Sequence, residues 1–142
     1  DRIHIVEDQE INDLTKSVRF AHRSGEQEVL ILGATGLRED HTLGNISLLM
    51  DYAPLFRRIE MLSDYGIFTP LRQTTTLASD PGTQVSLFSL APSGTISTTG
   101  LRWPIRDRRL TAWWQGTLNE ATGDNFTVAL SPEARVIVYR TF

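Results

Sequence analysis

The chain has 142 residues, of which 40% are hydrophobic and 22% charged, and this composition excludes a disordered or fibrous protein. The formal net charge of -3 argues against a nucleic-acid partner, and the longest apolar runs are too short to span a membrane. Because the sequence lacks cysteine and opens without a basic-then-apolar leader, it predicts a soluble cytoplasmic protein without a membrane anchor.

The first half alternates short apolar runs with helical periodicity. Residues 3–6 are expected to form a strand, and Asn12 or Asp13 to cap a helix that ends near Ser24-Gly25. Residues 29–32 form an uncharged run without alternation, which is typical of a parallel strand covered on both faces.

A second helix is predicted after a glycine-containing turn, from about Asp40 or Thr42 to Tyr52, followed by a third strand at residues 59–62. The order β-α-β-α-β indicates an open α/β sheet. Right-handed crossovers would place both helices on one face and leave the other bare. We therefore expect either a partner chain or an earlier segment of a longer chain to cover that face.

The second half changes to Thr, Ser and Gly with short alternating runs. These features predict an antiparallel β-sandwich or barrel lobe, in which Trp113 and Trp114, as neighbours in a strand, face opposite sides. The fold class is thus a partial open parallel α/β sheet (residues 1–72) followed by an antiparallel β-sandwich lobe (residues 73–142). Its expected strands are residues 85–90, 94–99, 110–116, 126–130 and 136–139.

A glycine turn follows the second expected strand. Gly33 and Gly36 resemble the start of a dinucleotide-binding fingerprint, but Glu39 stands where its third glycine belongs. A carboxylate there is too bulky for the close packing and repels a diphosphate, which disfavours a nucleotide-binding oxidoreductase. A plain strand-to-helix turn remains an alternative.

A charged cluster follows the glycine turn at the carboxyl end of a strand, where ligands of open α/β sheets bind. Arg38 can donate two hydrogen bonds to a phosphate, and the amides of the helix start can add more. Alternatively, Asp40 is only an N-cap and His41 only an exposed histidine of the first turn.

Lys16 is the sole lysine of the chain and lies one turn into the first helix, three residues after Asp13. The two residues can form an ordinary surface ion pair of little energetic weight. They can equally serve a phosphate site, with Lys16 as a point charge and Asp13 as a carboxylate ligand of Mg²⁺.

Together these motifs resemble the thiamin pyrophosphokinase family, in order and over nearly the whole chain. The resemblance implies pyrophosphate transfer from ATP to thiamine with Mg²⁺, giving thiamine diphosphate and AMP. It also implies a two-lobe homodimer with active sites between the subunits. The matching residues are Gln9, Asp13, Lys16, Gly33, Gly36, Arg38, Asp40, His41, Asn45, residues 98–103, Asn119 and Glu120.

The resemblance also implies roles for individual residues. Asp13 would bind magnesium, and Gln9 and Lys16 would lie beside the ATP phosphates. The second phosphate loop would comprise Gly33, Gly36, Arg38 and Asp40, with His41 and Asn45 on the same ATP side. The residues implied in catalysis are Asp13, Lys16, Arg38 and Asp40. Ser97 and Trp103 would hold the thiamine rings, with Asn119 close by. Without the resemblance, Trp103 is interpreted as a core aromatic residue.

The sequence departs from the family pattern in three ways. Leu118 replaces a usual serine, Leu37 replaces a frequent glycine, and the acidic first segment of the family, which supplies most magnesium ligands, does not precede the Gln9 motif. We therefore expect full activity to need that segment. The alternative is a non-catalytic thiamine-binding or dimerisation fragment.

Overall fold

The computed structural model describes residues 10–142. Gln9 and the strand expected at residues 3–6 lie outside the described residues. The first half contains α1 (Asp13–Arg23), β1 (Glu28–Ile31), α2 (Glu39–Tyr52), the short 3-10 helix η1 (Ala53–Leu55) and β2 (Arg58–Leu62). There follow β3 (Gly66–Leu71), β4 (Thr75–Ala78), β5 (Gln84–Ser89), β6 (Ile96–Thr99), the 3-10 helix η2 (Trp113–Gly116), β7 (Asn119–Glu120), β8 (Asn125–Leu130) and β9 (Val136–Thr141).

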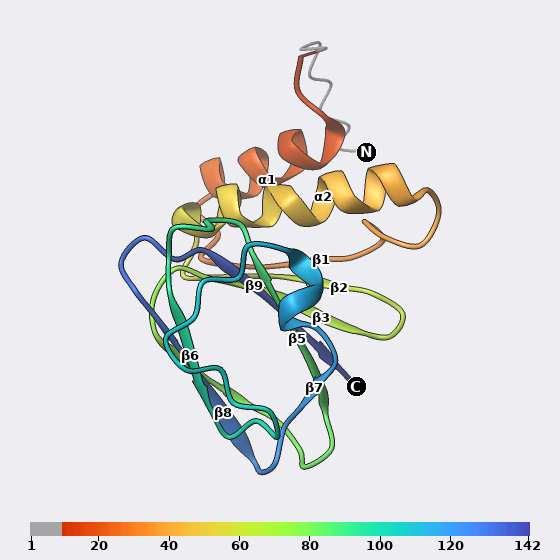
Figure 1. Ribbon diagram of the computed structural model, residues 1–142. Coiled ribbons are helices and arrows are strands. Elements are labelled where there is room, and N and C mark those ends of the chain that lie inside the picture. Colours follow the sequence, from red (N-terminus) through yellow and green to blue (C-terminus); the bar gives the residue numbers. More distant parts are fainter. Residues whose placement is uncertain (1–9) are drawn as a thin grey trace.

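Two sheets organise these strands (Figure 1). The larger sheet has the order β1-β2-β3-β9-β5-β7, and the smaller has the order β4-β8-β6. The strands β1 and β2 are parallel, with Val29 opposite Ile59, whereas the other strand pairs are antiparallel. The fold class expected from the sequence, an α/β part joined to a β-sandwich, is confirmed.

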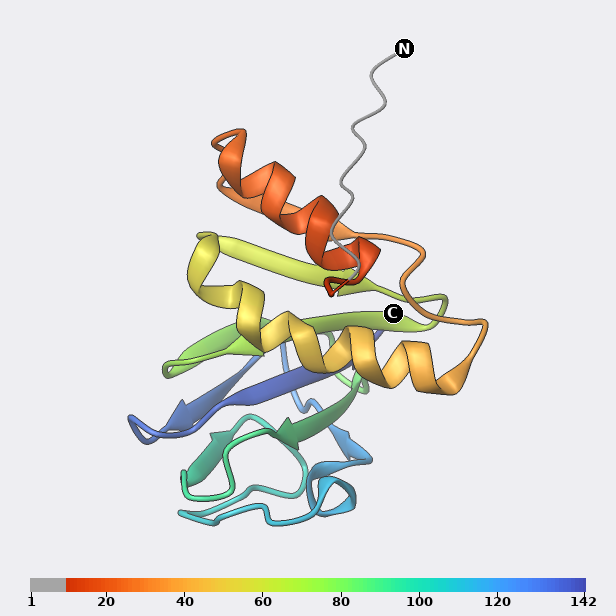
Figure 2. The same cartoon turned by 90° about the horizontal axis from the view of Figure 1, so that it is seen from above.

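The two helices cover one face of the larger sheet at its β1-β2-β3 end, as Figures 1 and 2 show. A first core lies beneath them, with Leu49 of α2 and Met61 of β2 fully buried. The second core fills the sandwich between the opposite face of the larger sheet and the smaller sheet, and it includes Leu87, Phe126 and Val138. Because β9 supplies Ile137 to the first core and Val138 to the second, one strand joins both cores.

Local interactions define the ends of α1. The N-cap is Asn12, whose Oδ1 accepts a hydrogen bond from the Thr15 amide at 2.8 Å. His22 and Arg23 stand in the last turn, where positive charge complements the helix dipole. Val18 is the buried residue of this helix, with Leu14 and Ala21 partly buried beside it, and the Thr15 hydroxyl lies 2.5 Å from the Tyr52 hydroxyl of α2.

The strand β1 is covered on one face only by the described residues, as expected from the crossovers, although its uncharged run is typical of a strand covered on both faces. Val29 and Ile31 pack toward the helices, whereas Leu30 between them is 52% exposed. The right-handed crossover explains this difference, because both helices reach the same face. The opposite face of β1 is therefore uncovered by the described residues.

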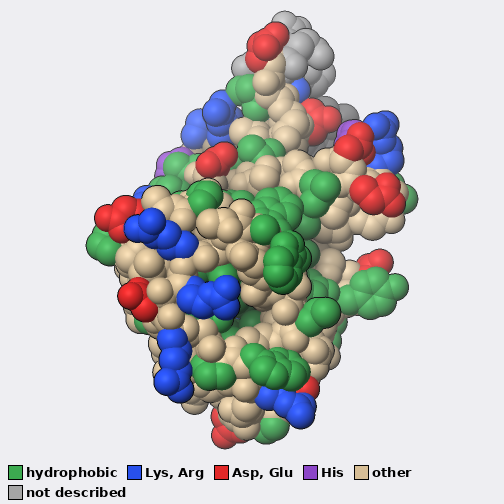
Figure 3. Space-filling view, viewed as in Figure 1, with side chains coloured by type: hydrophobic (Ala, Val, Ile, Leu, Met, Phe, Trp, Pro, Cys, Tyr) green, Lys and Arg blue, Asp and Glu red, His purple; other side chains and the backbone are tan. Residues whose placement is uncertain are grey.

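The sequence predicts a strand from Leu110 to Gly116, and this prediction is wrong. The segment is an irregular stretch that ends in η2. Trp113 and Trp114 consequently do not alternate across a sheet. Trp113 donates from Nε1 to the Ser89 carbonyl at 3.2 Å and contacts the Phe88 ring, while Trp114 is 75% exposed. Hydrophobic side chains gather on the surface over η2 (Figure 3).

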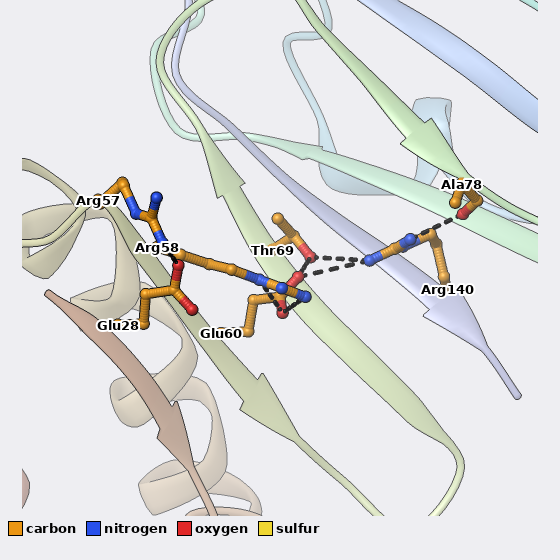
Figure 4. A network of polar contacts seen from close by, with 7 residues as sticks. All are labelled: Glu28, Arg57, Arg58, Glu60, Thr69, Ala78 and Arg140. Atoms are coloured by element: carbon orange, nitrogen blue, oxygen red, sulfur yellow. Dashed lines mark hydrogen bonds and ion pairs between the residues drawn. The ribbon is translucent and has the colours of Figure 1, made fainter.

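A buried polar network connects the two sheets where they meet (Figure 4). Glu60 is 5% exposed and forms ion pairs with Arg58 at 2.6 Å and with Arg140 at 3.5 Å. Thr69 donates to Glu60, and Arg140 donates to the Ala78 carbonyl of the smaller sheet at 2.8 Å. Burial lowers the pKa of Arg140, while the carboxylate of Glu60 opposes that change.

Candidate active site

The first group of expected site residues lies in the loop between β1 and α2, here called the glycine loop (residues 33–38). Gly33 and Gly36 have φ angles of +69° and +98°, which other residues adopt only with strain. Both helices begin at the side of the molecule where β1 ends (Figures 1 and 2). The free amides of the α2 start therefore lie next to this loop, where an anion would be favoured.

Asn45 connects α2 to the glycine loop. Its side chain is half-buried and donates from Nδ2 to the Ala34 carbonyl at 2.9 Å. This bond lies one turn beyond the helix start and fixes the middle of the loop. The structure thus gives Asn45 a contact that stabilises the loop conformation.

Arg38 and Asp40 pair with each other at the start of α2. Asp40 accepts from Arg38 Nε at 3.1 Å and Nη2 at 2.5 Å, and it also accepts from the His41 amide. These bonds lower the pKa of Asp40, with the Arg38 hydrogen bond as the largest cause. The N-cap position belongs to Arg38, so Asp40 holds the arginine rather than capping the helix. The side chain of His41 is exposed nearby.

Asp13 and Lys16 meet on the first turn of α1. Lys16 Nζ lies 3.2 Å from Asp13 Oδ1, and the lysine side chain is only 18% exposed whereas that of aspartate is 98% exposed. Neighbouring groups therefore enclose the lysine stem while the carboxylate faces solvent.

Asp64 was missed by the sequence reasoning. It lies two residues after the end of β2, and its Oδ2 lies 3.8 Å from the position that a Cβ on Gly36 would take. Ligands of open α/β sheets bind at the carboxyl ends of parallel strands, and β2 is the parallel neighbour of β1. The position of Asp64 after β2 could therefore have indicated this residue from the sequence.

The second group of expected residues surrounds a hollow at the open edge of the sandwich. This Trp103 hollow has a volume of about 270 Å³ and is lined by residues 103–105, Arg108 and residues 115–119. Trp103 is 55% exposed, which favours a contact surface over the core aromatic that the sequence alone suggested. The Arg102 guanidinium lies 5.1 Å from the centroid of its ring.

Two other residues expected near thiamine have different surroundings. Asn119 is 7% exposed and contributes to the wall of the Trp103 hollow. Ser97 lies on β6 between the buried residues Ile96 and Thr98, so it points to the outer face of the smaller sheet and accepts from the Asp107 amide at 2.9 Å. Ser97 does not line the hollow.

Leu118 has a strained backbone at the rim of the Trp103 hollow. Its φ of +60° is unfavourable for a residue with a Cβ, and its side chain is 78% exposed. Strain of this kind concentrates at functional sites. The departure from serine noted in the sequence thus exposes an apolar side chain at the rim.

Comparison with known protein families identifies the family of this chain. The family described as "Thiamin pyrophosphokinase, catalytic domain" matches residues 1–62, and "Thiamin pyrophosphokinase, substrate-binding domain" matches residues 66–139. The chain belongs to the thiamin pyrophosphokinase family. The first match contains the glycine loop and Lys16, and the second contains the Trp103 hollow.

Curated relatives and solved structures agree with this family. Thiamine pyrophosphokinase 1 of Oryza sativa subsp. japonica is 38% identical over 110 residues, which cover 69% of this chain and 41% of the relative. Thiamine pyrophosphokinase 2 of the same plant is 33% identical over 114 residues, covering 72% of this chain and 42% of the relative. The chain therefore spans about two fifths of the length of these relatives.

Two bacterial structures share the fold. Thiamine pyrophosphokinase from Bacillus subtilis superimposes with a TM-score of 0.82 at 20% identity, covering 94% of this chain and 64% of that one. Thiamin pyrophosphokinase from Geobacillus thermodenitrificans superimposes with a TM-score of 0.80 at 24% identity, covering 95% of this chain and 63% of that one.

The two family matches meet in the turn between β2 and β3, whereas the boundary expected at residues 72/73 stays a prediction. No helix within residues 10–142 is long and apolar enough to cross a membrane.

Proposed function

We propose that this chain forms part of an enzyme that transfers pyrophosphate from ATP to the hydroxyl group of thiamine, giving thiamine diphosphate and AMP. Membership of the thiamin pyrophosphokinase family supports the type of reaction. The observation that carries the proposal is the presence of two complementary sites in one chain. One is the glycine loop with Lys16 and Arg38, and the other is the hollow walled by Trp103.

The glycine loop and its basic neighbours suit the phosphates of ATP. Lys16 supplies a compact positive charge, and Arg38 can direct two hydrogen bonds to one phosphate. Arg38 now uses these donors on Asp40, so ATP would compete with that carboxylate for the arginine. Gln9, Gly33, Gly36, His41 and Asn45 complete the ATP side in this proposal.

The reaction is an attack of the thiamine hydroxyl oxygen on the β-phosphorus of ATP. A bond forms between these two atoms, the bond from the β-phosphorus to the bridging oxygen of AMP breaks, and the hydroxyl proton passes to a base. Catalysis then rests on positioning and on neutralising phosphate charge with Lys16 and Arg38. In the structure without nucleotide Asp40 accepts two hydrogen bonds from Arg38, and we assign this carboxylate the role of holding the guanidinium at the loop until ATP binds.

Asp13 is the carboxylate that we propose for Mg²⁺. No group of three or more His, Cys, Asp or Glu side chains within the described chain is arranged to hold a metal ion. A single exposed carboxylate nevertheless fits Mg²⁺, which commonly takes one or two carboxylates together with substrate phosphates and water. When bound, the ion would neutralise charge on the transferred group.

The thiamine side would use the exposed ring of Trp103, since a flat aromatic attracts a cationic thiazolium by stacking and cation-π interaction. None of residues 33–45 lines the hollow, and Figure 2 shows the glycine loop well apart from η2, which supplies Gln115 and Gly116 to the lining. We therefore propose a homodimer in which the loop of one subunit faces the hollow of the other.

A chain without cysteine fits the reducing cytoplasm, where we place the protein.

The proposed function is tested by measuring AMP release from MgATP with and without thiamine. The complete protein and the 142-residue chain are assayed in parallel, and sizing experiments give the oligomeric state. Thiamine-dependent AMP release by the complete protein supports the proposal. Thiamine binding without AMP release would instead favour a non-catalytic thiamine-binding or dimerisation module.

A further inference from the structure

Asn119 uses its side chain to hold the backbone of Trp103. Its Oδ1 accepts from the Trp103 amide at 3.1 Å, and its Nδ2 donates to the Trp103 carbonyl at 2.7 Å. The same Oδ1 also accepts from the Glu120 amide at 2.9 Å. The amide group thus makes three hydrogen bonds, and one N–H donor remains for any other contact.

These bonds extend an antiparallel pairing between residues 100–103 and 119–122. Leu101 pairs with Ala121, and the backbone amides of Arg102 and Thr122 donate to Glu120 and Gly100, each at 2.9 Å. At the next position, the side-chain amide of Asn119 takes the place of a backbone peptide opposite Trp103. Trp103 is therefore held on both its N–H and its C=O.

The arrangement matters because the Trp103 ring is the exposed wall of the hollow. Trp103 is 55% exposed, so burial alone does not fix this residue, and the hydrogen bonds from Asn119 to its backbone help to hold it in place. A binding group needs such support, because small displacements of a contact surface weaken binding.

We propose that Asn119 is a positioning residue of the thiamine site that acts through Trp103, rather than a direct thiamine ligand. This proposal deepens the proposed function and rests on it. Its chemical content is specific: the amide must both accept from the Trp103 N–H and donate to the Trp103 C=O. Asn119→Asp keeps the first bond and loses the second, whereas Asn119→Ala loses both.

The decisive experiment is a double-mutant cycle on the complete protein with Asn119→Ala and Trp103→Leu. A residue acting through Trp103 gives non-additive effects. We expect Asn119→Ala to raise the KM for thiamine about tenfold in the unaltered protein and less than twofold in the Trp103→Leu background, with the KM for MgATP unchanged. Equal effects in both backgrounds would overturn the proposal.

A second measurement uses the ligand-free protein. Fluorotryptophan labelling gives fluorine NMR signals, and loss of one signal in Trp103→Phe assigns that residue. Asn119→Ala and Asn119→Asp should shift or broaden the Trp103 signal before thiamine is added. An unchanged Trp103 signal in both variants would contradict the positioning role.

Asn125→Ala is the matched control, because Asn125 is an exposed asparagine of the same sandwich. It should change neither the KM nor the fluorine signal. If the unaltered complete protein forms no thiamine diphosphate, the proposed function fails, while the fluorine signal still tests the positioning role. If Asn119→Ala does not fold, Asn119→Asp carries the test, because its side chain has nearly the same shape.

Discussion

Asn45 donates a hydrogen bond from its side chain to the carbonyl of Ala34, across 2.9 Å, and so joins the second turn of α2 to the glycine loop. The two residues are eleven positions apart, and the bond closes the loop on the helix that follows it. The loop, whose positive φ angles require glycine at positions 33 and 36, is thereby held in its conformation before any ligand binds.

Replacing Asn45 with alanine should release this loop. A partly buried carbonyl loses its donor, so we expect a loss of about 1 kcal/mol in unfolding free energy, together with a several-fold increase in the KM for MgATP. Urea unfolding and steady-state kinetics measure the two effects. Ser47→Ala, on the same helix, is the control and should leave the KM for MgATP as it is.

Lys16→Ala should lower kcat strongly while changing the free energy of unfolding only slightly. Its ion pair with the exposed Asp13 contributes little to folding, whereas in the proposed function its positive charge would act on the ATP phosphates in the transition state. We expect at least a tenfold lower kcat and a stability change below about 1 kcal/mol.

The variant Lys16→Met separates charge from packing, because it keeps an apolar stem in the mostly enclosed position of the lysine. It should be as inactive as Lys16→Ala but more stable. Full activity of either variant in the complete protein would rule out the phosphate role.

Tyr52 should give the fold an alkaline limit. Burial raises the pKa of Tyr52 above its ordinary value of 10.0, while the hydrogen bond with Thr15 opposes the rise. The unfolded chain then loses its proton first, so stability is intact below pH 10.0 and falls as the pH rises through the pKa of the folded state.

Tyr52→Phe should therefore weaken the alkaline decline in unfolding free energy, and Thr15→Val should raise the pKa of Tyr52 further. Urea unfolding across this pH range and tyrosinate absorbance test the two statements. Tyr65→Phe, which removes an exposed phenol, is the matched control. An alkaline decline that is identical with and without the Tyr52 hydroxyl would contradict the prediction.

Glu60→Gln should destabilise the junction between the two sheets. The substitution leaves Arg58 and the largely buried Arg140 without their shared carboxylate, and breaking a buried ion pair costs about 3 kcal/mol. The matched control is Glu28→Gln, since Glu28 pairs with Arg57 at the exposed surface and should contribute about 0.5 kcal/mol or less. Equal losses in urea unfolding would show that burial of the network is energetically unimportant.

Glu120→Gln should weaken thiamine binding. Glu120 pairs with Arg102 at 3.5 Å, and Arg102 lies over the Trp103 ring, so removing the carboxylate leaves a positive charge beside the site proposed for a cation. We expect a Kd for thiamine a few-fold higher at low salt, with the difference shrinking as salt screens the charges. Titration calorimetry at two salt concentrations checks this, and a Kd independent of the carboxylate would refute it.

The sequence by itself determined both helices, the parallel pairing of β1 with β2, the sandwich character of the second half and the family. Hydrophobic periodicity and glycine placement are local signals, and the order of motifs along the chain needs no coordinates to be recognised. The single lysine and the residues after β1 were found for the same reason.

Only the tertiary structure decided how the residues of the second half are used. Trp113 and Trp114 follow an irregular stretch into η2, because the Trp113 indole reaches a carbonyl of β5 that is 24 residues away along the chain. Ser97 and Trp103 are close in sequence but only Trp103 lines the hollow, since strand alternation turns Ser97 outward. Asn119 contacts Trp103 through a pairing of distant segments, and such long-range pairings leave no local pattern in the sequence.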